Sequence, residues 1–174
     1  MYRDSFTRNL LPFIADEFEQ AYFSRLVPFY LEELNAYQAD YLIIQKVERK
    51  IAAFTIDIPI MEPMPIRYLT GPEATSRSTL KVEEDGAWYK ITGEIDEAFM
   101  TPDAHIFLSV RGESFEPKTY PVFYRMTKEG DGNGYQLYLK TASLPGDQVH
   151  INTVIKTADT IHIVATDVLQ RKEH

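Results

Sequence analysis

The sequence predicts a mainly β protein, in which a helical arm and an extended segment precede an antiparallel β-sandwich. Three observations predict this class. Apolar residues recur at spacings of three and four up to residue 54, three prolines lie between residues 59 and 65, and apolar and polar residues alternate from residue 78 onward. We therefore divide the chain into a helical arm (1–54), a Pro-rich extended strap (55–77) and a β-sandwich (78–170).

Two apolar patterns predict helices in the arm. The first runs from Leu10 to Leu26, and Pro28 should end it at Val27. The residues of the second pattern have the spacing of a narrow helical stripe, as in a coiled-coil seam. They are Leu31, Leu34, Tyr37, Tyr41, Ile44 and Ile51. The stripe predicts either a helix that packs against its own domain or the interface of a homo-oligomer.

The strap contains Pro59, Pro63 and Pro65, which exclude a helix and favour extended backbone. Its isoleucines and methionines make it apolar enough to lie on a surface. We therefore expect an extended segment packed on the protein.

Seven segments that alternate between apolar and polar residues predict short strands, with turn signals such as Asp85-Gly86 and Pro145-Gly146 between them. Together they indicate an immunoglobulin-like sandwich, without the cysteines of antibody domains. The segments are Thr79–Glu83, Ala87–Ile95, His105–Arg111, Tyr120–Met126, Tyr135–Thr141, Val149–Lys156 and Thr160–Thr166.

Composition limits the partners and the location. The chain has 174 residues, no cysteine, 18 Lys and Arg and 26 Asp and Glu, for a net charge of -8. Clustered cations supply most nucleic-acid affinity, so this charge argues against a nucleic-acid partner. The sequence shows neither a signal peptide nor an apolar run of roughly 18 residues that would span a membrane. We expect a cytoplasmic protein, or a fragment of a larger one.

The C-terminal layout has a counterpart in a known family. Strand Tyr135–Thr141 leads into Ser143-Leu-Pro-Gly-Asp147 and a second alternating strand, while Ile106–Gly112 and Tyr120–Arg125 continue the pattern upstream. This layout resembles the accessory region of bacterial cell-wall glycosyltransferases, particularly teichoic-acid glycosyltransferases, where a helical segment leads into immunoglobulin-like modules. The resemblance implies oligomerisation, contact with glycan, catalytic residues outside this chain, and a location at the inner face of the membrane through a parent enzyme.

Aromatic residues on polar strand faces are the candidate glycan-binding residues. Alternation places Ala87, Tyr89, Ile91 and Ile95 on one face of their strand and Trp88 on the other, with Lys90, Thr92 and Glu94. Flat rings beside hydrogen-bonding side chains suit the apolar faces of sugars. The alternative is that the helices or the strap cover these rings. The candidates are Trp88, Phe107, Phe123, Arg125 and Tyr138.

Other motifs give no expected catalytic residue, metal or cofactor. The loop Glu129–Tyr135 resembles the start of a calcium loop, but Lys140 stands where a bidentate glutamate is needed, so a tight turn is favoured. The four histidines lack zinc-site spacing. Acidic groups at 83–85 and 94–97 leave a carboxylate mechanism open.

Three functional hypotheses follow. The leading one is a non-catalytic accessory module of a cell-wall polymer glycosyltransferase, for oligomerisation and glycan binding. The alternatives are a stand-alone structural protein, such as a phage or surface component, and a small carboxylate-dependent hydrolase.

Overall fold

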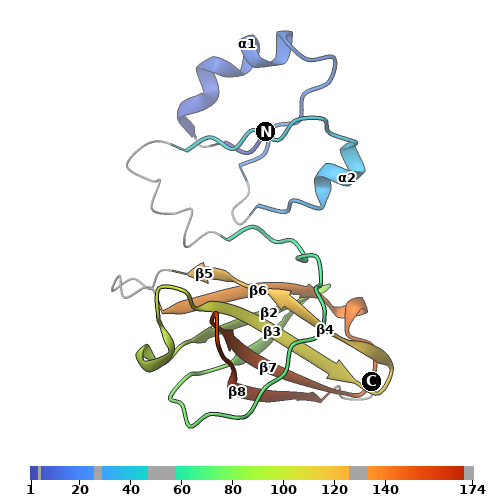
Figure 1. Cartoon of the computed structure of the whole chain (residues 1–174). Coiled ribbons are helices and arrows are strands. Elements are labelled where there is room, and N and C mark those ends of the chain that lie inside the picture. Colours follow the sequence, from blue (N-terminus) through green and yellow to red (C-terminus); the bar gives the residue numbers. More distant parts are fainter. Residues whose placement is uncertain (4, 26–28, 47–57, 126–132, 171–174) are drawn as a thin grey trace. The chain divides into compact units, whose positions relative to one another are not determined.

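The computed structural model describes residues 1–3, 5–25, 29–46, 58–125 and 133–170, with 5–7, 33, 35 and 123–125 described by their backbone alone. The chain forms two compact units, Met1–Met61 and Glu62–His174 (Figure 1). The second unit is β-sandwich-like, and the first contains short helices joined by extended chain.

The N-terminal unit contains the 3-10 helix η1 (Ser5–Leu10) and the helices α1 (Leu11–Asp16) and α2 (Glu33–Tyr37). Tyr2 lies at its centre and is buried. Its ring packs against Phe29 at 5.0 Å between centroids, and its hydroxyl donates to the Tyr30 carbonyl at 2.6 Å. The backbone around Tyr2 pairs with Ser24 on one side and Ile44 on the other. Long-range contacts therefore organise this unit.

The predicted helices are much shorter in the structure. The Leu10–Leu26 pattern forms α helix only to Asp16, because the backbone near Ser24 bonds to the Met1–Arg3 segment instead. α2 ends because Gln38 takes a φ of 47°, and the Ala39 amide then donates to the Leu34 carbonyl at 3.2 Å. This is the Schellman arrangement that ends many helices, usually with glycine in the left-handed position.

The second unit consists of two antiparallel four-stranded sheets. The strand orders are β1-β2-β6-β5 and β4-β3-β7-β8. Short 3-10 helices lie at Glu97–Phe99 (η3) and Thr141–Ser143 (η4). The strands are β1 (Lys81–Asp85), β2 (Trp88–Glu94), β3 (His105–Gly112), β4 (Phe115–Pro121), β5 (Phe123–Arg125), β6 (Gly134–Lys140), β7 (Gln148–Lys156) and β8 (Ile161–Gln170).

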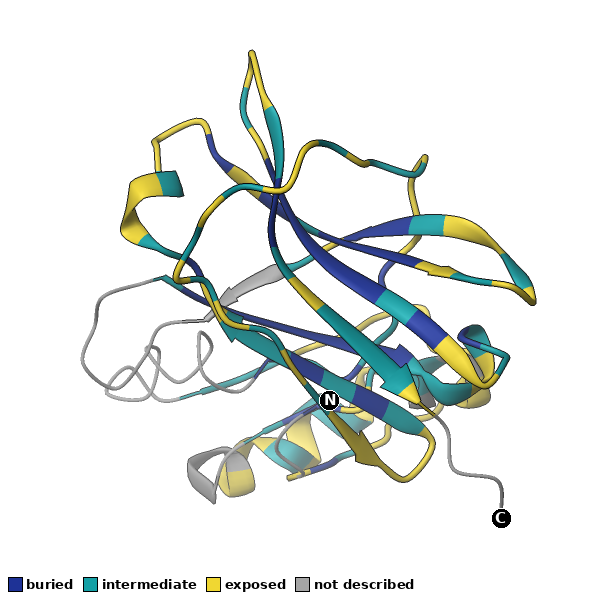
Figure 2. Cartoon of the chain, turned by 90° about the horizontal axis from the view of Figure 1, so that it is seen from below, coloured by how far each residue is buried: buried dark blue, intermediate teal, exposed yellow. Residues whose placement is uncertain are grey.

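The core of this unit consists of side chains from both sheets. Tyr89 and Ile91 from β2 meet residues of the other sheet such as Leu108 and Ile151, and all four are almost fully buried. Buried and half-buried residues alternate at the start of β2, whereas β6 is buried along nearly its whole length (Figure 2). The predicted inward face of β2 is confirmed for Tyr89, Ile91 and the following Ile95, whereas Ala87 is exposed just before the strand begins.

Strand β4 was not predicted from the sequence. Pro117 and Pro121 argue against a strand, but β4 lies at a sheet edge, where a missing amide is tolerated. The predicted strand Tyr120–Met126 is divided between the sheets, since β4 ends at Pro121 and β5 begins at Phe123 in the other sheet. The chain thus changes sheets at Val122.

The strap lies on the sandwich from residue 62 onward. Ile66 extends the edge of β4 by pairing with Thr119, and Glu73 pairs with Ile163 on β8 at the opposite edge. Between these edges Leu69 is held by side chains of the outer sheet face, because Ser109 donates to its carbonyl at 2.7 Å. The strap thus crosses the outer face of the sheet β4-β3-β7-β8.

Candidate functional site

Trp88 lies at the start of β2, directly after the turn that joins β1 to β2. Gly86 takes a φ of 62° in this turn, a conformation that glycine adopts without strain. Because Tyr89 points into the core, strand alternation directs Trp88 to the outer face of the sheet β1-β2-β6-β5. Trp88 is half-buried there.

The neighbours of Trp88 come from β6. The Tyr138 ring meets the Trp88 ring edge-on, with 6.5 Å between centroids and 87° between planes. The Lys140 ammonium lies 5.9 Å from the centre of the Trp88 ring, within range of a cation–π attraction. Gln136 Nε2 donates to the Tyr138 hydroxyl at 3.0 Å. An amide, a phenol, an indole and an ammonium thus lie side by side.

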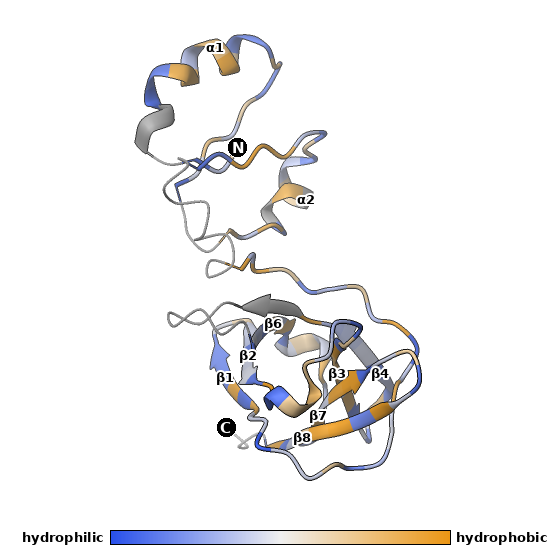
Figure 3. Cartoon of the chain, turned by 60° about the vertical axis from the view of Figure 1, so that its left-hand side comes forward, coloured by the Kyte–Doolittle hydropathy of each residue, from blue (hydrophilic) through white to orange (hydrophobic). Residues whose placement is uncertain are grey.

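The same face continues across β2 onto β1. Register places Lys90 opposite both Tyr138 and Glu83, so the face alternates between cations, acids and rings. Lys81 pairs with Glu83 at 2.7 Å, and the Lys81 hydrogen bond and charge lower the pKa of this exposed carboxyl. β1 is mostly hydrophilic (Figure 3), as expected of an exposed edge strand. We call Trp88, Lys90, Gln136, Tyr138 and Lys140 the sheet platform.

The structure brings some of the residues that were predicted to bind glycan together and separates others. Trp88 and Tyr138 touch, although Tyr138 is only 5% exposed. β5 pairs with β6 so that Phe123 stands opposite Gln136 and Arg125 opposite Gly134, which places both residues on this sheet. The structure describes only their backbone. Phe107 is half-buried on β3 of the other sheet, so it does not belong to the sheet platform.

The predicted interface residues do not form one helical stripe. Leu34 and Tyr37 lie on α2, whereas Tyr41 and Ile44 lie on non-helical chain and Leu31 precedes the helix. Leu31, Leu34 and Ile44 are half-buried, while Tyr37 is 49% and Tyr41 72% exposed. Ile51 lies outside the described residues.

Glu62 holds the end of β6, a role that the sequence did not indicate. Its carboxylate accepts hydrogen bonds from the Lys140 amide at 3.2 Å and from the Ser143 hydroxyl at 2.9 Å. It therefore caps the C-terminal end of β6. β5 pairs only with the first three residues of β6, Gly134 to Gln136, and does not reach this end. A single acid in a Pro-rich segment gives no sequence signal for this role.

Asp96, one of the acids considered for catalysis, has a structural role in the described chain. It accepts hydrogen bonds from the amides of Arg77 at 2.9 Å and Ala98 at 3.2 Å, and these bonds lower the pKa of its carboxyl. Asp96 thus begins η3 and fixes the end of the strap. Because both carboxylate oxygens accept from backbone, this acid is committed to holding the loop.

No metal-binding group of three or more His, Cys, Asp or Glu side chains occurs among the described residues. His162 packs against Phe99 at 6.1 Å between ring centroids. The loop compared with a calcium site includes residues 129–132, which lie outside the described residues. Within the described part of the chain, no helix has the length and apolar character needed to cross a membrane.

Comparison with known proteins adds a likeness in structure alone. No family model matches the chain, and no curated protein does. Among solved structures, the chain is similar to superoxide reductase from Nanoarchaeum equitans, with a TM-score of 0.33 and 17% sequence identity, over 61% of this chain and 99% of that chain. A likeness this distant carries no functional argument, so the geometry of the sheet platform is what bears on function.

Proposed function

We propose that the chain is a non-catalytic accessory module that binds glycan and self-associates, in the manner of the C-terminal regions of bacterial cell-wall polymer glycosyltransferases. The observation that carries this proposal is the sheet platform, where Trp88, Tyr138 and Lys140 lie on one outer sheet face. The catalytic residues of the parent enzyme lie outside this chain.

The chemistry of the sheet platform supports a glycan ligand. Sugars present apolar C–H faces edged by hydroxyls, and the half-buried Trp88 ring beside the Lys90 and Lys140 ammonium groups offers partners for both, whereas Gln136 and Tyr138 are buried and support the ring from beneath. The Lys140 ammonium over the ring and Lys90 opposite Tyr138 further favour a polymer with acidic substituents such as phosphate. In this proposal a sugar reaches the Trp88 ring when the Lys140 ammonium moves aside on its flexible stem.

The strand order supports the immunoglobulin-like class. With the strands taken in chain order as A, B, C, C′, D, E, F and G, the two sheets read A-B-E-D and C′-C-F-G. The first sheet has the order of an immunoglobulin constant domain, and the second adds one edge strand to it. In this arrangement the sheet platform occupies the outer face of the A-B-E-D sheet.

Exposed apolar residues of the N-terminal unit support self-association. Nine of the eleven large apolar side chains that are exposed among the described residues belong to Met1–Met61, including Phe13 and Tyr41 at 71% and 72%. Exposed apolar side chains in this number favour association with another copy. Tyr37 and Tyr41 remain the proposed aromatic contacts of this interface.

Cosedimentation with insoluble cell-wall polymer tests glycan binding. Trp88→Ala should weaken binding by about tenfold or more, as for a central aromatic residue of a binding surface. Phe107→Ala is the matched control, because Phe107 is also a half-buried aromatic but lies on the other sheet. Equal binding by Trp88→Ala and the unmodified chain, with both folded by circular dichroism, would contradict the proposal.

A further inference from the structure

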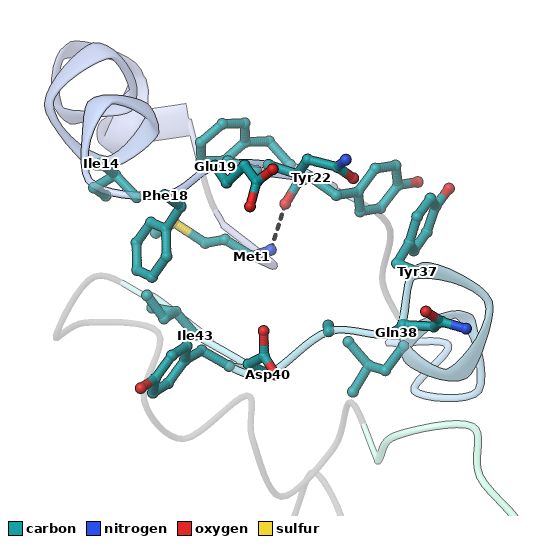
Figure 4. A pocket seen from close by; sticks show the side chains of 15 residues that line it. Met1, Ile14, Phe18, Glu19, Tyr22, Tyr37, Gln38, Asp40 and Ile43 are labelled. Carbon is teal, nitrogen blue, oxygen red and sulfur yellow. Dashed lines mark hydrogen bonds between the residues drawn. The ribbon is translucent and has the colours of Figure 1, made fainter.

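The N-terminal unit contains a cavity of about 560 Å³. Its walls are two chain segments, residues 18–23 and residues 37–41, with Met1, Ile14, Leu34 and Ile43 completing the lining (Figure 4). No arginine or lysine belongs to this lining.

Two aromatic pairs join the walls. Phe18 meets Tyr41 with 6.0 Å between ring centroids, and Tyr22 stacks on Tyr37 at 4.3 Å. Each pair takes one ring from each wall, and the four rings are between 37% and 72% exposed. Aromatic surface therefore remains accessible at the cavity.

Two carboxylates lie between these pairs along the chain, one on each wall. Glu19 and Asp40 both point toward the space between the walls (Figure 4). Neither side chain has a hydrogen-bond or ion-pair partner among the described residues. The Met1 nitrogen donates to the Tyr22 carbonyl, and the side chains of the lining carry two negative charges and no positive one.

We propose that this cavity binds an organic ammonium group, such as a small alkylamine or quaternary amine. Aromatic faces and carboxylates attract such a cation together, since ring quadrupoles and negative charges favour the same ligand. Two carboxylates are too few for a calcium ion, which takes six to eight oxygen ligands. The inference is independent of glycan binding at the sheet platform.

Calorimetric titration of the full chain with choline and with its neutral isostere 3,3-dimethyl-1-butanol tests the proposal. Tyr37 and Tyr41 also belong to the proposed interface, so the protein is used at a concentration at which light scattering finds monomer. Choline should bind about tenfold more tightly than the isostere, which keeps the shape but lacks the charge. Added salt should weaken the binding of choline but leave the binding of the neutral isostere unchanged.

Variants locate the site. Asp40→Asn and Glu19→Gln should each weaken choline binding by about threefold, because each removes one carboxylate charge while the exposed position preserves the fold. Glu17→Gln is the matched control, since Glu17 is exposed two residues before Glu19 but does not line the cavity. Equal affinity for choline and the isostere, or equal losses in Glu17→Gln and the two cavity variants, would overturn the proposal.

Discussion

Tyr135 carries the polar contacts at the centre of the sandwich core. Its hydroxyl donates to the Thr79 carbonyl at 3.1 Å and so accepts from the Thr153 hydroxyl at 2.6 Å. Gly93 makes room for this arrangement, because a Cβ atom there would overlap both the Tyr135 hydroxyl and the Thr79 carbonyl. The hydroxyl therefore links both sheets and the chain entering β1.

Tyr135→Phe should lower the free energy of unfolding by about 1–3 kcal/mol, because it leaves the buried Thr153 hydroxyl and the Thr79 carbonyl without this partner. Urea denaturation measures the change. Tyr68→Phe serves as the control, since the Tyr68 hydroxyl has no hydrogen bond among the described residues. Equal stabilities for the two variants would contradict the role given to Tyr135.

Stability should decline at high pH. Burial raises the pKa of Tyr135 from 10.0 to about 12, and burial together with the Glu62 charge raises that of Tyr120 to about 12. Between about pH 10 and pH 12 these two tyrosines have lost their protons in the unfolded chain but keep them in the folded chain, so the free energy of unfolding falls as pH rises. Below about pH 10 both tyrosines are neutral in the folded and in the unfolded chain, so the stability that depends on their neutral form is fully present there.

Denaturation midpoints at pH 9 and pH 11 check this dependence. Tyr135→Phe should lose less stability over the interval than the unmodified chain, because one of the two shifted groups is gone. Identical losses would show that Tyr135 does not ionise differently in the folded and unfolded states.

The sequence predicts individual residues well where strand alternation governs them. Tyr89 and Ile91 face the core as predicted, and Trp88 lies on the opposite face. The role of Glu62 was unpredictable, because its partners, Lys140 and Ser143, are about 80 residues away along the chain.

At the scale of elements, the strap depends on two buried hydroxyls. The Leu69 amide donates to Thr119 Oγ1 at 2.8 Å, and the Ser109 hydroxyl donates to the Leu69 carbonyl at 2.7 Å. The two hydroxyls also bond to each other at 2.7 Å. Both side chains are nearly inaccessible to solvent, so water cannot replace these bonds.

Thr119→Val keeps the shape of the side chain but removes the acceptor for the Leu69 amide, at a cost of about 1–3 kcal/mol. The strap should open more often, and trypsin should cleave at the exposed Arg67 about fivefold faster. Mass spectrometry of the fragments measures the rate. Thr166→Val, at an exposed position on β8, should cleave like the unmodified chain, and an unchanged rate in Thr119→Val would refute this account of the strap.

Strands were more predictable than helices because their signals are local. A two-residue alternation and a turn such as Asp85-Gly86 fix β1 and β2 without outside information. The ends of α1 and α2 depend instead on pairing with the Met1–Arg3 segment and on the left-handed Gln38. Apolar spacing alone cannot show either cause.

At the scale of the whole molecule, we predict self-association through the N-terminal unit. Light scattering of the full chain should give a multiple of 20.1 kDa, whereas Phe13→Asp should shift the protein toward monomer. Phe13 is 71% exposed, so the substitution changes the surface without emptying a core. Residues 62–174 supply the sandwich core by themselves and should be monomeric. A full chain that stays monomeric at high micromolar concentration would contradict the prediction.

The β-sandwich-like class was predictable because strand patterns recur over most of the second unit. The pairing of the sheets was not, since it depends on contacts between distant strands such as β2 and β6. That pairing decides the candidate site, because it places Trp88 beside Tyr138 and leaves Phe107 on the other sheet.

Trp88 is the chain's only tryptophan, so its fluorescence reports directly on the sheet platform. The central claim is that this platform binds the glycan of a cell-wall polymer. Titration with soluble teichoic-acid polymer should change the emission of Trp88 in a saturable way, at the same polymer concentration in the unmodified chain and in Phe107→Ala. Emission that stays constant while sedimentation shows the polymer bound would place the glycan elsewhere and contradict the claim.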